Sequence, residues 1–270
     1  MAKKILISND DGVKAPGIDA LAHYATTLGE IVIIAPDSQR SAGGKSLTFH
    51  KPLRINKSTT LSGFKAYSMN GSPADSIIMY HHFFKRDPDI VISGINSGEN
   101  ASLHSILTSG TCAVALEAGL RDVPSFALSI DVPEEMFFKP VKETKYEIAA
   151  KIGIKIIEKL LKLPENYWSE VLFVNINFPR NVSEETPLKI AMPAKYKYEN
   201  FLVERIDPRG EKYYWLWGEL RKDLEPETDA YQVLKNNTIT ITPISFNSRK
   251  ELVKMTYDAL NEYLNKTKKG

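Results

Sequence analysis

The chain of 270 residues has a single cysteine, Cys112. One cysteine excludes an intramolecular disulfide framework and a zinc site built from several thiolates. This cysteine usage fits a reducing compartment, so we expect a cytoplasmic protein. Cys112 follows a Ser-Gly-Thr sequence at the start of an apolar helical pattern, where it is better interpreted as a small buried residue than as a nucleophile.

The chain also lacks a large net charge and any long apolar run. Its 35 lysines and arginines oppose 33 acidic residues, which leaves a net charge of +2. This balance gives no electrostatic reason to expect a nucleic-acid polymer or an anionic membrane as a partner. No stretch approaches the roughly 20 apolar residues that span a bilayer. Polar residues follow the first apolar run, residues 5–7, at once, so we expect no signal segment.

Hydrophobic residues make up 43% of the chain, enough for a substantial core. Up to about residue 180, β-branched runs alternate with apolar residues at helical spacing. The predicted strands are residues 5–7, 31–35, 89–93, 125–129 and 171–178. The predicted helices are residues 17–29, 110–120 and 143–162. Buried strands separated by helices indicate an α/β fold with a mostly parallel sheet flanked by helices.

The character of the sequence changes after residue 190. Residues 191–246 are rich in Tyr, Trp, Pro and charged residues, with the cluster Tyr213-Tyr214-Trp215-Leu216-Trp217 in the middle. We therefore divide the chain into a main domain (1–190), an extended segment (191–246), and a C-terminal helix with a tail (247–270). The last helix is predicted to begin at a capping box from Ser248 to Glu251. The aromatic cluster either contacts another subunit or lies against its own domain.

Two adjacent carboxylates, Asp10 and Asp11, follow the first predicted strand. Side chains of consecutive strand residues point to opposite faces, so both can reach one ion only if the strand ends there. Gly12 permits the turn that this requires. Oxygen ligands of this kind suit a hard divalent ion such as Mg²⁺ or Mn²⁺. A solvated Asp-Asp-Gly turn is the alternative interpretation.

Three further polar clusters stand where predicted strands end or helices begin. Residues 35–44 form a Gly-rich loop that contains Ser41, and residues 93–100 include Asn96, whose amide oxygen can bind a cation. Residues 108–111 precede a helix, where free N–H groups attract an anion. Each cluster alone could be a connection or a helix cap. Because ligands gather at the carboxyl ends of parallel strands, we expect the clusters to lie together with the two acids.

The order of the motifs carries a family resemblance over nearly the whole chain. The motifs are Ser8-Asn9-Asp10-Asp11-Gly12, Ala15-Pro16-Gly17, Ala35-Pro36-Asp37 with Arg40-Ser41, Gly71-Ser72-Pro73-Ala74-Asp75, Ser93-Gly94-Ile95-Asn96, Ser109-Gly110-Thr111 and Asp207-Pro208-Arg209-Gly210. As an ordered set they closely resemble the stationary-phase survival protein family, SurE. The resemblance implies a phosphatase that hydrolyses nucleoside 5'- and 3'-monophosphates, or other small phosphomonoesters, with one divalent metal cation, Mg²⁺ or Mn²⁺. It also implies a Rossmann-like catalytic domain and a C-terminal extension exchanged between the subunits of a homodimer or homotetramer.

The resemblance further implies two groups of site residues. The metal ligands of the family fall on Asp10, Asp11, Ser41 and Asn96. Its phosphate contacts fall on Asn96, Ser109, Gly110 and Thr111. On this interpretation Asp10, Asp11 and Asn96 are the catalytic residues, and a metal-activated water attacks phosphorus. His104 and Lys14 stand near these motifs in the sequence and are further candidates for contact with substrate.

Two other classes of protein remain open. A haloacid-dehalogenase-type phosphatase also has an Asp at the end of its first strand, but it uses that Asp as a covalent nucleophile and its second Asp comes two positions later. In this chain the acids are adjacent, which argues against that class. A nucleotide-binding regulator without catalysis would keep the same pocket and lack turnover.

Overall fold

The computed structural model describes residues 2–133, 145–246, 251, 253–256 and 258–260. Its main sheet has nine strands in the order β3-β4-β2-β1-β5-β6-β7-β11-β8. The five strands at its centre all run parallel. They are β1 (Lys4–Ser8), β2 (Glu30–Pro36), β5 (Ile90–Ser97), β6 (Ser125–Ile130) and β7 (Phe173–Phe178). All five correspond to predicted strands, so the expected mostly parallel sheet is confirmed.

The outer strands make the sheet mixed. On one side, β4 lies parallel to β2 and β3 lies antiparallel to β4. On the other side, β11 lies antiparallel to β7 and β8 lies parallel to β11. These strands are β3 (Ile55–Thr59), β4 (Lys65–Met69), β8 (Leu188–Ile190) and β11 (Ile239–Ile244).

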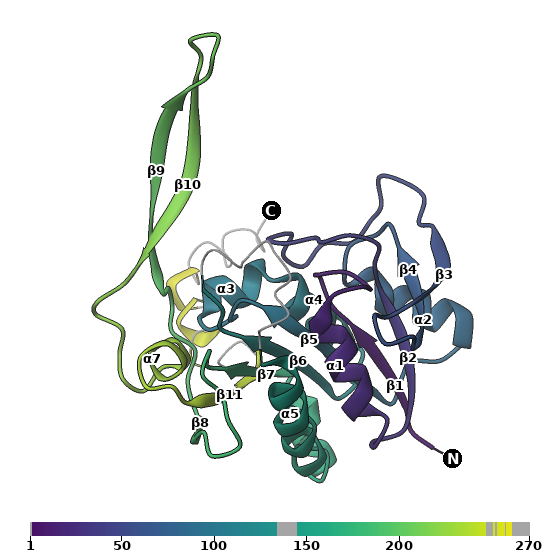
Figure 1. Cartoon of the computed structure of the whole chain (residues 1–270). Helices are drawn as coiled ribbons and strands as arrows, with labels where there is room; N and C mark the ends of the chain where they lie inside the picture. The colour runs from purple at the N-terminus through teal and green to yellow at the C-terminus, as the bar shows by residue number, and fades with distance from the viewer. Residues whose placement is uncertain (1, 134–144, 247–250, 252, 257, 261–270) are drawn as a thin grey trace, which may run out of the picture.

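Helices cover both faces of the sheet (Figure 1). Ile5 and Ile7 of β1 belong to the core under α1 (Pro16–Ala25) and α5 (Tyr146–Leu160). Leu6, which points to the opposite face, belongs to the core under α2 (Asp75–Phe84) and α4 (Gly110–Gly119). Because the central strands are buried on both faces, their sequences are continuous apolar runs. The shorter helices are α3 (Leu103–Thr108), α6 (Glu165–Glu170) and α7 (Asp229–Leu234).

The sequence of α5 places Ile148, Ala149, Ile152, Ile156 and Leu160 at helical spacing, which predicts one apolar face, and the buried face of the helix differs from it. The large residues of the predicted face, Ile148, Ile152 and Ile156, are only partly buried. The fully buried residues are Tyr146, Ala149, Ala150, Gly153, Ile154 and Ile157. Three of these, Ala149, Ala150 and Gly153, are small, which lets the helix approach the sheet closely.

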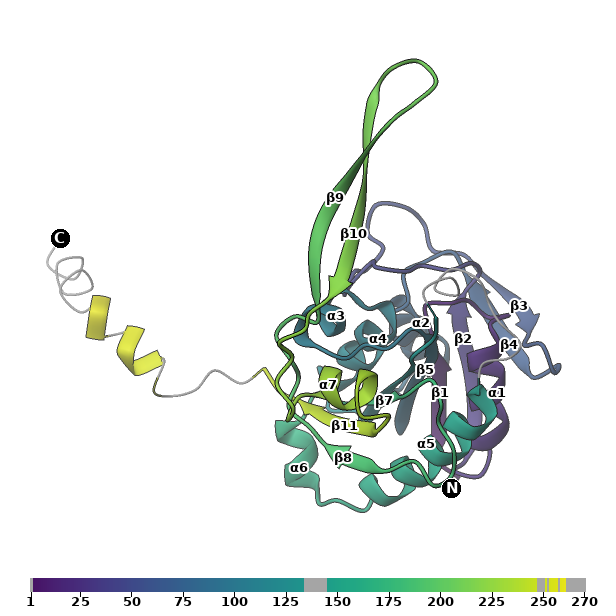
Figure 2. The same ribbon diagram turned by 60° about the vertical axis from the view of Figure 1, so that its left-hand side comes forward.

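The segment 191–246 divides into two parts with different surroundings. The strands β9 (Tyr198–Ile206) and β10 (Lys212–Leu220) pair only with each other, as an antiparallel hairpin that projects from the body (Figures 1 and 2). In contrast, β11 belongs to the main sheet and α7 contacts it. The expectation of one continuous extension is therefore corrected for this part, because the Thr- and Ile-rich run of β11 buries its side chains within the sheet.

The described residues between 251 and 260 are helical, as expected, whereas the predicted capping residue Ser248 lies outside the described residues. None of the helices in the described part of the chain combines the length and the hydrophobicity needed to cross a bilayer.

Candidate functional site

Four of the predicted site residues line one cavity of about 270 Å³. Asp10 follows β1, Asn96 lies near the end of β5, and Ser109 precedes α4. Ser41 comes from the loop after β2. That loop is held against the α3–α4 region, where Gly44 N donates to Thr108 O at 2.9 Å. The strand ends thus bring together residues that are far apart in the sequence, as the topology predicts.

The other three predicted residues stand around Asp10 and are not part of the cavity wall. Thr111 Oγ1 donates to Asp10 Oδ1 at 2.5 Å. Gly110 lies so close that a Cβ atom at this position would come within 2.8 Å of Asp10 Oδ2. Asp11 Oδ2 accepts a hydrogen bond from Ser97 N at 3.0 Å. The start of α4 and the end of β5 therefore hold the acid pair from two sides.

A tight turn after β1 orients the two acids. Gly12 has a φ of +102°, which is favourable only for glycine. Asn9, which is fully buried, closes the turn, because its amide donates to Gly12 O at 3.0 Å and accepts from Gly12 N at 3.1 Å. The strand therefore ends where the sequence required it to end. Asn9 is a positioning residue whose role sequence reasoning did not identify.

Burial makes the acid pair unfavourable to ionise without a cation. Burial raises the pKa of Asp10, and the hydrogen bond from Thr111 opposes this shift. Burial and then the charge of Asp10 raise the pKa of Asp11 to about 7. A cation in contact with both carboxylates would reverse these effects, since an opposite charge favours the ionised form.

The donor set fits a hard divalent cation. Among the described residues, no three His, Cys, Asp or Glu side chains gather as a metal cluster. The oxygens available are instead two carboxylates with the Ser41 hydroxyl and the Asn96 amide. Asn96 Nδ2 donates to Gly98 O at 2.6 Å, so the amide oxygen is the atom left to accept or coordinate. Carboxylate and neutral oxygens suit Mg²⁺ or Mn²⁺ better than zinc.

The N-terminus of α4 faces the same region. Ser109 is its N-cap, and Ser109 Oγ accepts a hydrogen bond from Cys112 N at 3.1 Å. The positive end of a ten-residue helix attracts an anion, which supports a phosphate position next to Ser109. Burial raises the pKa of Cys112 to about 12, so its thiol is not an activated nucleophile.

The structure separates the two further candidates, His104 and Lys14. His104 lines the cavity, and its ring centroid lies 5.1 Å from that of Tyr196. Lys14 Nζ instead donates to Thr59 Oγ1 at 2.9 Å. Lys14 is thereby engaged by the end of β3 and does not line the cavity wall.

Sequence reasoning missed an ion pair in the wall of the cavity. Lys197 Nζ binds the carboxylate of Glu99 and also donates to Glu99 O at 2.8 Å. The side chains are only 5% and 2% exposed. Glu99 follows Asn96 by three residues, and Lys197 immediately precedes β9. No local signal in the sequence connects two residues that are 98 positions apart.

An amide network at the cavity wall holds the loop that follows Asn96 and the end of β5. Asn100 N donates to Asn177 Oδ1 and Asn100 Nδ2 to Ser129 Oγ, both at 2.8 Å. Asn175 Nδ2 donates to Asn100 O at 2.9 Å. These bonds tie the loop after β5 to β6 and β7, so Asn100 is a second positioning residue that the sequence alone did not reveal.

Comparisons of the sequence and of the structure with known proteins all point to one family. The family model "Survival protein SurE" matches residues 5–200. The chain is 41% identical to a 5'-nucleotidase SurE from Methanocella arvoryzae over 250 residues, which cover 90% of this chain and 92% of the relative. It is 39% identical to a 5'-nucleotidase SurE from Methanosarcina acetivorans over 271 residues, which cover 98% of each. The crystal structure of the SurE protein from Aquifex aeolicus superposes with a TM-score of 0.78 and 31% identity, and covers 96% of this chain and 99% of that one.

Proposed function

This chain belongs to the SurE family, and we propose that it is a metal-dependent phosphatase that hydrolyses nucleoside 5'-monophosphates to nucleoside and phosphate. The observation that carries the proposal is the cavity in which buried Asp10 meets Asn96, Ser41 and the N-terminus of α4. The names of the relatives support the same activity, since those from Methanocella arvoryzae and Methanosarcina acetivorans are 5'-nucleotidases. We include nucleoside 3'-monophosphates among the substrates on the family resemblance.

In this proposal one divalent cation, Mg²⁺ or Mn²⁺, is held by Asp10, Asp11, Ser41 and Asn96. Such a cation lowers the pKa of a bound water and neutralises charge that develops on the phosphoryl oxygens. The residues of the chain hold the two carboxylates and the phosphate in position. Thr111 fixes the carboxylate of Asp10, and Ser97 N fixes that of Asp11. Ser109 and the N–H groups at the start of α4 orient the phosphate.

Attack by water is favoured over a covalent aspartyl-phosphate. Asp10 already accepts a hydrogen bond from Thr111, and Asp11 accepts from Ser97 N and from Gln39 Nε2 at 3.3 Å. Donors on both sides therefore fix the orientation of the two carboxylates, as is typical of carboxylates that bind a metal ion. Trapping of a phosphorylated Asp10 or Asp11 by rapid acid quench would support the covalent alternative instead.

The first prediction tests the activity itself. With Mn²⁺ or Mg²⁺ the protein hydrolyses nucleoside 5'-monophosphates, and a chelator abolishes turnover until metal is added in excess. The assay measures phosphate release from 5'- and 3'-mononucleotides, polyphosphate and p-nitrophenyl phosphate under each condition. Equal turnover in the chelator would contradict the metal site, and nucleotide binding without turnover would favour the regulator.

The projecting hairpin supports assembly with further copies of the chain. Its two strands carry exposed aromatic and aliphatic residues on both faces. An isolated two-stranded ribbon is marginally stable, and apolar patches of this kind mark interaction sites. The exposed residues include Phe201, Leu202, Ile206, Tyr213, Tyr214, Trp215, Leu216 and Trp217. We therefore propose that β9 and β10 contact other subunits of a homodimer or homotetramer.

The second prediction concerns this hairpin. Replacing residues 199–219 with a short Gly-Ser linker converts the assembly to a monomer and leaves the main domain folded, because the hairpin pairs only with itself. Tyr198 and Leu220 are partners in the hairpin ladder, so a short linker can join them. Sedimentation velocity measures the mass, and circular dichroism measures the fold. Phe49→Ser, which removes an exposed apolar side chain elsewhere, is the control and keeps the assembly. A monomeric full-length protein would contradict the proposal.

A further inference from the structure

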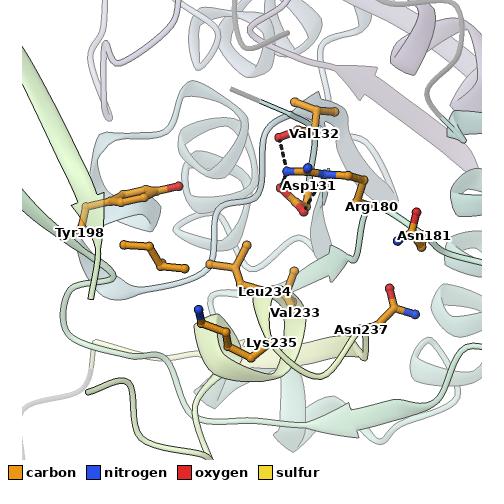
Figure 3. Close-up of a pocket in the computed structure, with 10 residues that line it drawn as sticks. Asp131, Val132, Arg180, Asn181, Tyr198, Val233, Leu234, Lys235 and Asn237 are labelled. Atoms are coloured by element: carbon orange, nitrogen blue, oxygen red, sulfur yellow. Dashed lines mark hydrogen bonds and ion pairs between the residues drawn. The ribbon is translucent and has the colours of Figure 1, made fainter. Parts of the chain in front are cut away.

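A second cavity of about 440 Å³ lies beside the metal and phosphate site. Its residues come from the segments that follow β6 and β7, from the base of the hairpin, and from the end of α7. Figure 3 shows Tyr198 extending from β9 toward the Asp131–Arg180 pair, with Val233 and Leu234 of α7 below. The volume is in the range of small-molecule sites. The function described above leaves this cavity without a role.

One side of the second cavity offers polar groups in fixed positions. Arg180 Nε lies 3.3 Å from Asp131 Oδ2, and an Arg180 guanidinium nitrogen donates to Val132 O at 3.0 Å. The Asp131 side chain is only 12% exposed. Asn181 and Asn237 add two amides to the lining. Carboxylate, guanidinium and amide groups are those that recognise the polar edges of nucleobases.

The side formed by α7 and the base of the hairpin is apolar apart from Lys235, and it has an aromatic ring. Leu220, Val233 and Leu234 line it together with Tyr198. Lys197 Nζ lies 5.4 Å from the centroid of the Tyr198 ring, so the Glu99–Lys197 ion pair also fixes this ring. An aromatic ring and aliphatic side chains suit the flat faces of a nucleobase.

The two cavities are adjacent. Tyr198 lines both of them. Burial raises the pKa of Asp131, and the charge of Glu99, which lines the first cavity, raises it further. β5 and β7 are two strand spacings apart, or about 10 Å, and Arg180 lies three residues beyond Asn177, which is in register with Asn96 through Ser129. A nucleoside 5'-monophosphate has one ribose between phosphate and base, and it spans a gap of this order.

We propose that the second cavity binds the nucleoside part of the substrate. The base lies between the Tyr198 ring and Leu234, and the Asp131–Arg180 pair and Asn181 contact its polar edge. This assignment rests on the proposed nucleotidase activity and makes the second cavity the determinant of nucleoside recognition. The two cavities then bind different parts of the substrate. The first binds the phosphate, and the second distinguishes nucleotides from other phosphomonoesters.

The third prediction tests this subsite with Asn181→Trp. Asn181 is exposed at the rim, so a larger side chain there fills the cavity without disturbing the core. We expect KM for nucleoside 5'-monophosphates to rise about tenfold or more, with kcat/KM for p-nitrophenyl phosphate unchanged. Inhibition by free nucleosides weakens in parallel. Glu185→Trp, an exposed position on the same connection but outside the cavity lining, is the matched control and changes neither substrate.

A second variant keeps the test decisive if the tryptophan lowers the melting temperature. Arg180→Gln removes the guanidinium from a half-exposed side chain, and we expect the same selective rise in KM. An equal change for both substrates, or no change for either, would overturn the subsite. If either variant weakens inhibition by inorganic diphosphate and leaves inhibition by nucleosides unchanged, the cavity binds an anion. That result would also overturn the subsite. A wild-type protein without metal-dependent turnover of either substrate would instead refute the proposed function.

Discussion

Asp10→Asn and Asp11→Asn each abolish phosphatase activity and binding of Mn²⁺ while the protein remains folded. Removal of one carboxylate takes away a ligand and half of the negative charge that holds the cation. A metal contributes several kcal/mol to stabilisation of the transition state, so we expect turnover to fall about a thousandfold or more. Phosphate release measures activity, and titration calorimetry with Mn²⁺ measures binding.

Loss of one carboxylate is expected to stabilise the fold of the metal-free protein. Because burial and the charge of Asp10 raise the pKa of Asp11 to about 7, ionised Asp11 destabilises the folded state when no cation is bound. A raised carboxyl pKa costs stability as pH rises from the unfolded value near 3.8 to the folded value, and the full cost is present above it. Asp11→Asn therefore raises the melting temperature of the chelated protein at pH 8 by a few degrees, and this gain disappears toward pH 4.

Asp122→Asn is the matched control for this series, since it neutralises an exposed carboxylate after α4. We expect it to change neither Mn²⁺ binding nor the pH dependence of the melting temperature. Full activity in Asp10→Asn or Asp11→Asn would refute the metal site. A large loss of stability in the chelated variants would mean that the two acids stabilise the fold in some other way.

Lys197→Met destabilises the protein strongly, because it leaves the carboxylate of Glu99 buried without its partner. Loss of one member of a buried ion pair costs about 3–5 kcal/mol, which corresponds to a fall in melting temperature of roughly 10 °C for a chain of this size. The double variant with Lys197→Met and Glu99→Met recovers most of the loss, since two apolar side chains of similar volume replace both charges. Urea denaturation measures each free energy of unfolding.

Lys195→Met is the control for the ion pair, because Lys195 is exposed in the same segment. It is expected to change the free energy of unfolding by less than about 0.5 kcal/mol. If Lys197→Met is no more destabilising than this control, the ion pair has no role in holding the base of the hairpin against the loop after β5. A double variant as unstable as the single one would show that packing of the lysine stem matters more than its charge.

Much of the fold and the core of the site followed from local patterns. The strands before Asp10 and Asn96 are continuous apolar runs, and such runs indicate strands buried on both faces of a parallel sheet. Because parallel strands place their carboxyl ends at one edge, the polar residues that follow them were expected to meet. The shared cavity of Asp10, Ser41, Asn96 and Ser109 agrees with that expectation.

The same local patterns led to the wrong prediction that β11 belongs to the extended segment. Its sequence alternates Ile and Thr from Ile239 to Thr242, and it follows an aromatic segment that resembles an extension. Only its pairing with β7 and β8 makes it part of the main sheet. For Thr111, the sequence predicts a phosphate contact, and the structure adds a hydrogen bond from its hydroxyl to Asp10 that the sequence did not reveal.

The sequence by itself determined the five central strands, the helices α1, α4 and α5, the turn at Gly12 and the oxygen-rich character of the site. Each of these depends on neighbouring residues, through periodicity, backbone conformation and side-chain chemistry. The tertiary structure alone decided the pairing of Glu99 with Lys197, the amide network of Asn100 and the second cavity around Tyr198. These features depend on which distant segments meet when the core closes, and a buried charge or amide finds its partner only after that packing is complete.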